Sequence, residues 1–153
     1  PVEEFIQKGT VYKTTYKPLR EGYRFLGWYK DGVRYSFTQP VTEDITLTAK
    51  WASEDETFIE LSADSCTLSN FNGIGTVYLA SYNANGALMN IKTVSINNMP
   101  TVEIQTISAE NAEGSVIYFK EIGFETEGAA KISAFLWSES MTALCESDSI
   151  SLN

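Results

Sequence analysis

The side chains that carry most enzyme chemistry are sparse in this chain. There is no histidine, so the commonest general base and the commonest metal ligand are both absent. A serine nucleophile would then need a lysine or a carboxylate as its base, yet the sequence contains neither a Ser-x-x-Lys motif nor a Gly-x-Ser-x-Gly turn. No glycine-rich phosphate loop occurs either. We therefore expect no catalytic residues and no enzymatic activity.

Carboxylates are the remaining candidates for chemistry. Glu121, Glu125 and Glu127 are close enough in sequence to supply the acid pair of a glycoside hydrolase. A small sandwich rarely forms the deep cleft that this reaction needs, so we expect them to be surface acids. Asn83 and Asn85 resemble half of a calcium loop but lack its downstream acid. The sequence therefore predicts no metal site and no cofactor.

The two cysteines, Cys66 and Cys145, lie far apart and form no Cys-x-x-Cys pair. Two thiols are too few to hold zinc without histidine. Two alternatives remain for them. They form a disulfide, which an extracellular setting would permit, or they are two separate buried thiols in short apolar segments.

Composition describes a globular chain with an uneven charge. Of 153 residues, 43% are hydrophobic and 20% are charged, and no apolar run reaches the length of a membrane span. The net charge of −9 divides into +2 for residues 1–52 (8 basic, 6 acidic) and −11 for residues 53–153 (3 basic, 14 acidic). So acidic a chain is a poor partner for nucleic acid or for an anionic membrane surface.

Alternation along the first part predicts strands. In Ile45-Thr-Leu-Thr-Ala-Lys-Trp51 the apolar residues share one face. In Gly22-Tyr-Arg-Phe-Leu-Gly-Trp-Tyr29 a β-bulge at the inner glycine would bring Tyr23, Phe25 and Trp28 to one core. Asp31-Gly32 predicts the tight turn that follows.

The second part predicts an antiparallel β-sandwich. Residues 53–56 are polar and acidic, and we interpret them as a linker between domain 1–52 and domain 57–153. About seven short strands follow, separated by turn residues. Ser138 is a plausible N-cap for one helical turn over 138–144. The strands are expected at 58–62, 66–68, 75–82, 88–96, 102–107, 116–119, 130–137 and 149–152, with an initial strand around 5–12 and turns at 97–100 and 111–114.

A family resemblance covers about the first 52 residues. Lys17-Pro-Leu-Arg-Glu-Gly-Tyr-Arg-Phe-Leu-Gly-Trp-Tyr29, with Val41-Thr-Glu-Asp-Ile-Thr-Leu-Thr-Ala-Lys-Trp51, closely resembles the Listeria–Bacteroides repeat, or internalin-type B-repeat. The resemblance implies a small β-grasp-like fold in a secreted or cell-wall-associated bacterial protein, serving adhesion or spacing. Family members usually begin with a further strand, so this segment is either a truncated repeat or one whose first strand lies upstream.

A weaker resemblance covers residues 57–153. Val77–Val94 and Ala134–Cys145 look like Ig-like or fibronectin-III-like accessory modules of secreted Firmicutes proteins. The pattern usually has aspartate where Ser138 stands. Together the two resemblances imply an all-β, non-catalytic structural or adhesive module pair at the bacterial cell surface. Its expected partners are neighbouring domains of a longer chain and a host-surface protein or a polysaccharide, without nucleic acid and without membrane insertion.

The alternative function is that of a carbohydrate-binding module in an extracellular protein that acts on polysaccharide. It requires exposed rings on one face with hydrogen-bonding groups beside them. The candidates for stacking on a ligand are Tyr29 and Tyr35 in the first part, and Tyr82 and Trp137 in the second.

Overall fold

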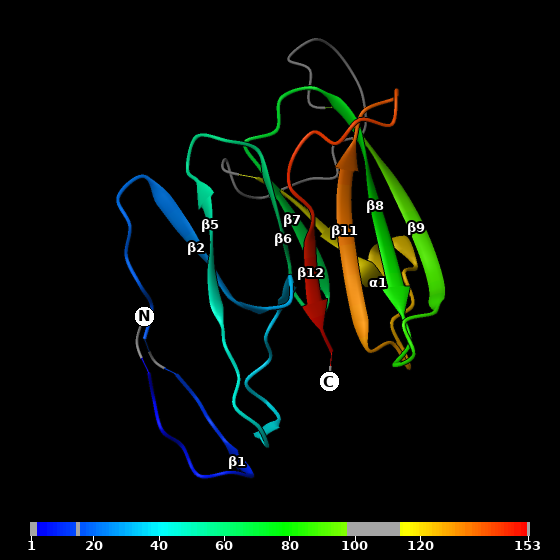
Figure 1. Cartoon of the computed structure of the whole chain (residues 1–153). Helices are drawn as coiled ribbons and strands as arrows, with labels where there is room; N and C mark the ends of the chain where they lie inside the picture. Colours follow the sequence, from blue (N-terminus) through cyan, green and yellow to red (C-terminus); the bar gives the residue numbers. More distant parts are fainter. Residues whose placement is uncertain (1–2, 15, 98–113, 153) are drawn as a thin grey trace.

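The protein is almost entirely β-structure (Figure 1). The computed structural model describes residues 3–14, 16–97 and 114–152. Within them there is one helix, α1 (Phe119–Ile122), and no helix long and apolar enough to cross a membrane. The predicted all-β fold class is confirmed.

The strands share short lengths and frequent turns. They are β1 (Thr10–Val11), β2 (Tyr23–Lys30), β3 (Val33–Arg34), β4 (Pro40–Val41), β5 (Thr48–Ser53), β6 (Phe58–Leu61), β7 (Ser65–Ser69), β8 (Ile74–Tyr82), β9 (Leu88–Asn97), β10 (Gly114–Tyr118), β11 (Lys131–Trp137) and β12 (Asp148–Ser151).

The largest sheet crosses the predicted linker. Its order is β5-β2-β3-β12-β11-β8-β9, so strands from before and after residues 53–56 hydrogen-bond in one sheet. The two groups meet where β12 pairs in parallel with β3, with Ile150 opposite Arg34. A three-stranded sheet, β10-β7-β6, and the pair β1-β4 complete the structure. The division into domains 1–52 and 57–153 stays a prediction.

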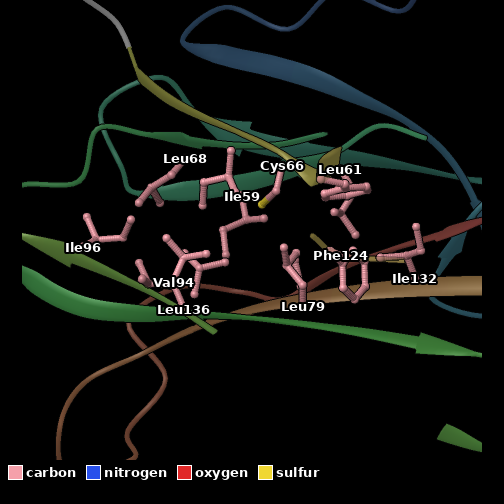
Figure 2. Close-up of a cluster of buried hydrophobic side chains, with 14 of the residues drawn as sticks. Ile59, Leu61, Cys66, Leu68, Leu79, Val94, Ile96, Phe124, Ile132 and Leu136 are labelled. Carbon is pink, nitrogen blue, oxygen red and sulfur yellow. The ribbon is translucent and has the colours of Figure 1, made fainter. Parts of the chain in front are cut away.

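The main core lies between the three-stranded sheet and the β12-β11-β8-β9 part of the large sheet (Figure 2). Alternate residues of each strand point inward because side chains on a strand alternate between faces. Leu61, Leu79 and Leu136 each have 0% exposure, and burying a side chain of this kind stabilises a fold by about 1.5–3 kcal/mol. As predicted for residues 75–82, β8 is a central strand, between β9 and β11.

The bulge predicted at Gly27 is present. The pairing of β2 with β5 shifts register between Phe25 and Gly27, and Gly27 has a φ of 135°, which side-chain-bearing residues rarely adopt. The shift brings Trp28 to the face of Phe25, with their ring centroids 5.4 Å apart. Phe25 also contacts Trp51, its partner on β5, at 5.4 Å. The expectation for Tyr23 was wrong: it is 37% exposed. It begins β2 opposite Ser53, the last residue of β5, at the end of the pairing, and the Arg20 guanidinium lies over its ring.

Two local predictions differ from the structure, and one element was not predicted. No helical turn forms over 138–144; a hydroxyl-rich turn closes there with a bridge between Trp137 and Ala143. Only Thr10 and Val11 of the expected first strand pair with β4. The helix α1 was not predicted, since four residues carry no helical periodicity. The strand expected at 102–107, and the turns at 97–100 and 111–114, lie wholly or partly outside the described residues.

Candidate functional site

A buried carboxylate joins the two parts of the chain. Asp148 is the first residue of β12 and is 1% exposed. Its Oδ1 accepts a hydrogen bond from the Tyr29 hydroxyl at 2.5 Å, and its Oδ2 accepts one from the Leu61 backbone N–H at 2.8 Å. A charge removed from water is costly unless it is paired and hydrogen-bonded, so these partners are what allow Asp148 to be buried.

Two cations complete the surroundings of Asp148. Arg34 Nη2 lies 3.4 Å from Oδ2, and Lys50 Nζ lies 3.5 Å from Oδ1. Both also hold backbone oxygens of the second part: Arg34 donates to Leu61 O at 2.6 Å, and Lys50 donates to the Ser147 carbonyl at 2.8 Å. The junction, defined as Tyr29, Arg34, Lys50 and Asp148, therefore places three residues of the first part around one acid of the second.

The network extends to the surface through Glu60 on β6. Glu60 Oε1 lies 3.8 Å from Arg34 Nη2, and Glu60 Oε2 lies 3.0 Å from Arg24 Nη2. The opposite net charges of residues 1–52 and 53–153 therefore meet at this boundary, where basic residues of one part pair with acids of the other. The Arg24–Glu60 pair is more exposed than the Arg34–Asp148 pair, so it contributes less to stability.

Burial governs the titration of groups at and near the junction. Desolvation, followed by the hydrogen bond to Asp148, raises the pKa of Tyr29 well above its ordinary value. Burial likewise raises the pKa of the Cys66 thiol and brings the pKa of Cys145 to about 11. Both cysteines are free thiols, Cys66 buried and Cys145 partly buried, so the structure has the unbonded thiols of the second alternative but not the full burial of both. At neutral pH they are protonated, and a thiol is a far weaker nucleophile than a thiolate.

The predicted stacking residues of the first part lie apart from each other. Tyr29 is 6% exposed, and Arg34 and Lys50 lie over its ring at 5.7 and 5.1 Å from the centroid. Tyr35 packs edge-on against Phe37 at 4.9 Å, and Phe37 in turn contacts Tyr12. Tyr29 thus serves the junction, while Tyr35 is a half-buried member of a separate cluster.

The predicted pair in the second part is also divided. Tyr82 stands opposite Lys131 at one end of the β8–β11 pairing, and Trp137 stands opposite Thr76 at the other end. Lys131 Nζ lies 4.5 Å from the centroid of the Tyr82 ring. Trp137 instead contacts Tyr78 at 5.0 Å and Phe135 at 5.6 Å.

Sequence reasoning missed Tyr78 and Phe135 as companions of Trp137. Phe135 and Trp137 are two residues apart, so they share a face of β11, and that signal was available. The pairing of Phe135 with Tyr78 was not, because it depends on the register between two strands that are 49 residues or more apart in the chain.

The acids considered for hydrolysis line a hollow beside α1. Glu121, Glu125 and Glu127 lie around it with Asp64, and all four are exposed. Among the residues that the structure describes, no group of three or more cysteine or carboxylate side chains is arranged to hold a metal ion. A general acid for glycoside hydrolysis sits in an apolar, shielded pocket, and these exposed side chains do not have such surroundings.

Comparison with known proteins identifies the first part of the chain. Residues 2–50, about a third of the sequence, match the Listeria-Bacteroides repeat domain family. This segment is therefore a Listeria-Bacteroides repeat, as the sequence predicted. Repeats of that family are non-catalytic modules that occur in bacterial surface or extracellular proteins. No curated protein and no solved structure matches the chain. The resemblance of residues 57–153 to secreted sandwich modules stays a prediction.

Proposed function

We propose that this chain is a non-catalytic structural and adhesive module pair of a secreted or cell-surface bacterial protein, in which the repeat and the sandwich act as one rigid spacer. The observation that carries the proposal is the junction. Asp148 is held by a hydroxyl, a backbone N–H and two cations drawn from β2, β3, β5 and β6. A spacer transmits position only if its parts do not pivot.

The repeat family supports the setting. Repeats of this kind occur in bacterial surface proteins, where a chain must extend binding domains away from the cell. The continuity of the large sheet across residues 53–56 supports stiffness, since strand pairing resists bending far more than a flexible linker does. Host-surface proteins or polysaccharides are the partners that such a position would bring within reach.

Backbone ¹⁵N relaxation on the whole chain tests the rigid-spacer proposal. We expect amides of β2 and β5 to report the same rotational correlation time as amides of β8 and β11. Arg34→Ala removes one cation and three hydrogen bonds of the junction, so the correlation times of the two groups of amides should diverge in that variant. Two clearly different correlation times in the unaltered chain would show a pivoting linker and would contradict the proposal.

A further inference from the structure

Three aromatic rings form a continuous patch on the outer face of the large sheet. Tyr78 on β8 stands directly opposite Phe135 on β11, and Trp137 follows two residues later on the same face. The Trp137 ring lies 5.0 Å from Tyr78 and 5.6 Å from Phe135, tilted by 46° to each. All three side chains are partly exposed. We call Tyr78, Phe135 and Trp137 the ring patch.

The ring patch is held in place before any ligand arrives. The residues alternating with it, Val77, Leu79, Ala134 and Leu136, belong to the main core. Both strands are internal to the sheet, and the rings contact one another. A surface that is already ordered loses little side-chain entropy on binding, which favours affinity.

The neighbouring side chains on this face are neutral and carry hydroxyl groups. Thr76 lies opposite Trp137 and Ser95, and Thr93 lies opposite Tyr78. The nearest cation on the same face of β8 and β11, Lys131, stands at the far end of the β8–β11 pairing beside Tyr82. With a net charge of −9 for the whole chain, this surface favours an uncharged partner over an anionic one.

A loop of hydroxyls borders the rings at the end of β11. Ser138 Oγ lies 2.9 Å from Ser140 Oγ, and Ser140 Oγ lies 3.3 Å from Thr142 Oγ1. The Tyr78 hydroxyl contacts Met141 Sδ at 3.6 Å, which attaches this loop to the ring patch. Each hydroxyl both donates and accepts hydrogen bonds, so the loop offers a row of polar partners beside an apolar platform.

We propose that the ring patch and the 138–142 loop form a binding site for a neutral polysaccharide. One face of a pyranose ring presents C–H groups, which pack on aromatic rings, while its edge presents hydroxyls, which pair with the loop. An aromatic surface beside a few polar groups has the composition of a site that orients a small polar ligand. This binding role is additional to the spacer role and does not depend on it.

Affinity electrophoresis of the whole chain tests this site. The probes are soluble neutral polysaccharides (xyloglucan, arabinoxylan, galactomannan and mixed-linkage β-glucan), with polygalacturonate as the anionic comparison. We expect at least one neutral probe to retard the protein and polygalacturonate not to. Trp137→Leu, which keeps an apolar side chain but removes the ring, should weaken that binding at least tenfold, whereas Trp137→Phe should keep it within about threefold.

Tyr82→Ala is the matched control, because its ring lies on the same strand and face but outside the ring patch; it should bind as the unaltered chain does. Circular dichroism and thermal melting establish that each variant is folded. If Trp137→Leu does not fold, Phe135→Leu replaces it with the same expected loss. Failure of every neutral probe to retard the protein, or equal binding by the ring-deleted variant, would overturn the proposal. The proposal would also be wrong if the unaltered chain bound no polysaccharide but bound a protein partner, and Trp137→Leu bound that partner equally well.

Discussion

At the scale of single residues, the stability of the junction depends on Asp148, which pairs with all three other residues of the junction. It is buried at 1% exposure with partners on both oxygens. Removing one member of a buried, hydrogen-bonded charge cluster leaves the others unpaired, and that penalty exceeds the value of any one contact. The stability of the junction therefore depends on the complete set of partners rather than on one strong bond.

Asp148→Ala should lower the free energy of unfolding by about 3–5 kcal/mol, because Arg34, Lys50 and the Leu61 N–H lose their shared acceptor. Urea unfolding measures the change. The matched control is Glu43→Gln, which breaks the exposed Lys30–Glu43 pair and should change the free energy by less than about 1 kcal/mol. If the two substitutions lowered the free energy of unfolding equally, the buried contacts of Asp148 would contribute no more than an exposed ion pair.

The titration of Tyr29 makes the stability of the junction depend on pH in the alkaline range. Its folded pKa lies above the value it has in the unfolded chain, so the unfolded state releases its proton first as pH rises. The stability from the protonated hydroxyl is therefore complete below about pH 10 and declines above that value. In Tyr29→Phe this part of the decline should vanish, whereas the contributions of Cys66 and Cys145 remain. Urea unfolding at pH 8, 10 and 11 compares the two slopes, and identical slopes would contradict the assignment.

At the scale of elements, β2 shows how one glycine positions several side chains. The bulge at Gly27 shifts the register of β2 against β5. That shift turns Phe25 and Trp28 to one cluster and leaves Tyr29 directed at Asp148. A β-carbon at Gly27 would lie 3.2 Å from Arg34 Nε, so the same glycine also leaves room for the arginine of the junction.

Gly27→Ala should lower the free energy of unfolding by about 1–3 kcal/mol, because alanine is strained at a φ of 135° and crowds Arg34. Gly32→Ala is the control: its φ is 79°, but its β-carbon would meet no atom within 4 Å. We expect the Gly32 substitution to cost only its backbone strain, about 1 kcal/mol. Chemical denaturation measures both, and a smaller loss for Gly27→Ala than for Gly32→Ala would argue against the role of the contact.

At the scale of the whole molecule, the repeat and the sandwich share a sheet and a charged junction. Elements that share a continuous sheet and buried contacts tend to unfold together, since neither part keeps its partners alone. The small cluster of Leu26, Ala52 and Phe58 also contains residues from both parts.

Scanning calorimetry of the full chain should show a single transition whose calorimetric and van't Hoff enthalpies agree. Asp148→Ala should separate it into two transitions or broaden it, because the first part has only a small core of its own. Two resolved transitions in the unaltered chain would instead describe independent domains.

The sequence alone determined the all-β class, the Gly27 bulge, the central position of β8 and the repeat family of the first part. Each depends on local signals: alternation, turn residues and a motif of fixed spacing. Only the tertiary structure decided that Tyr29 is a junction residue and that Tyr78 lies beside Phe135 and Trp137. Those outcomes depend on register and on contacts between residues up to 119 positions apart, and no local pattern encodes which face of one strand meets which face of another.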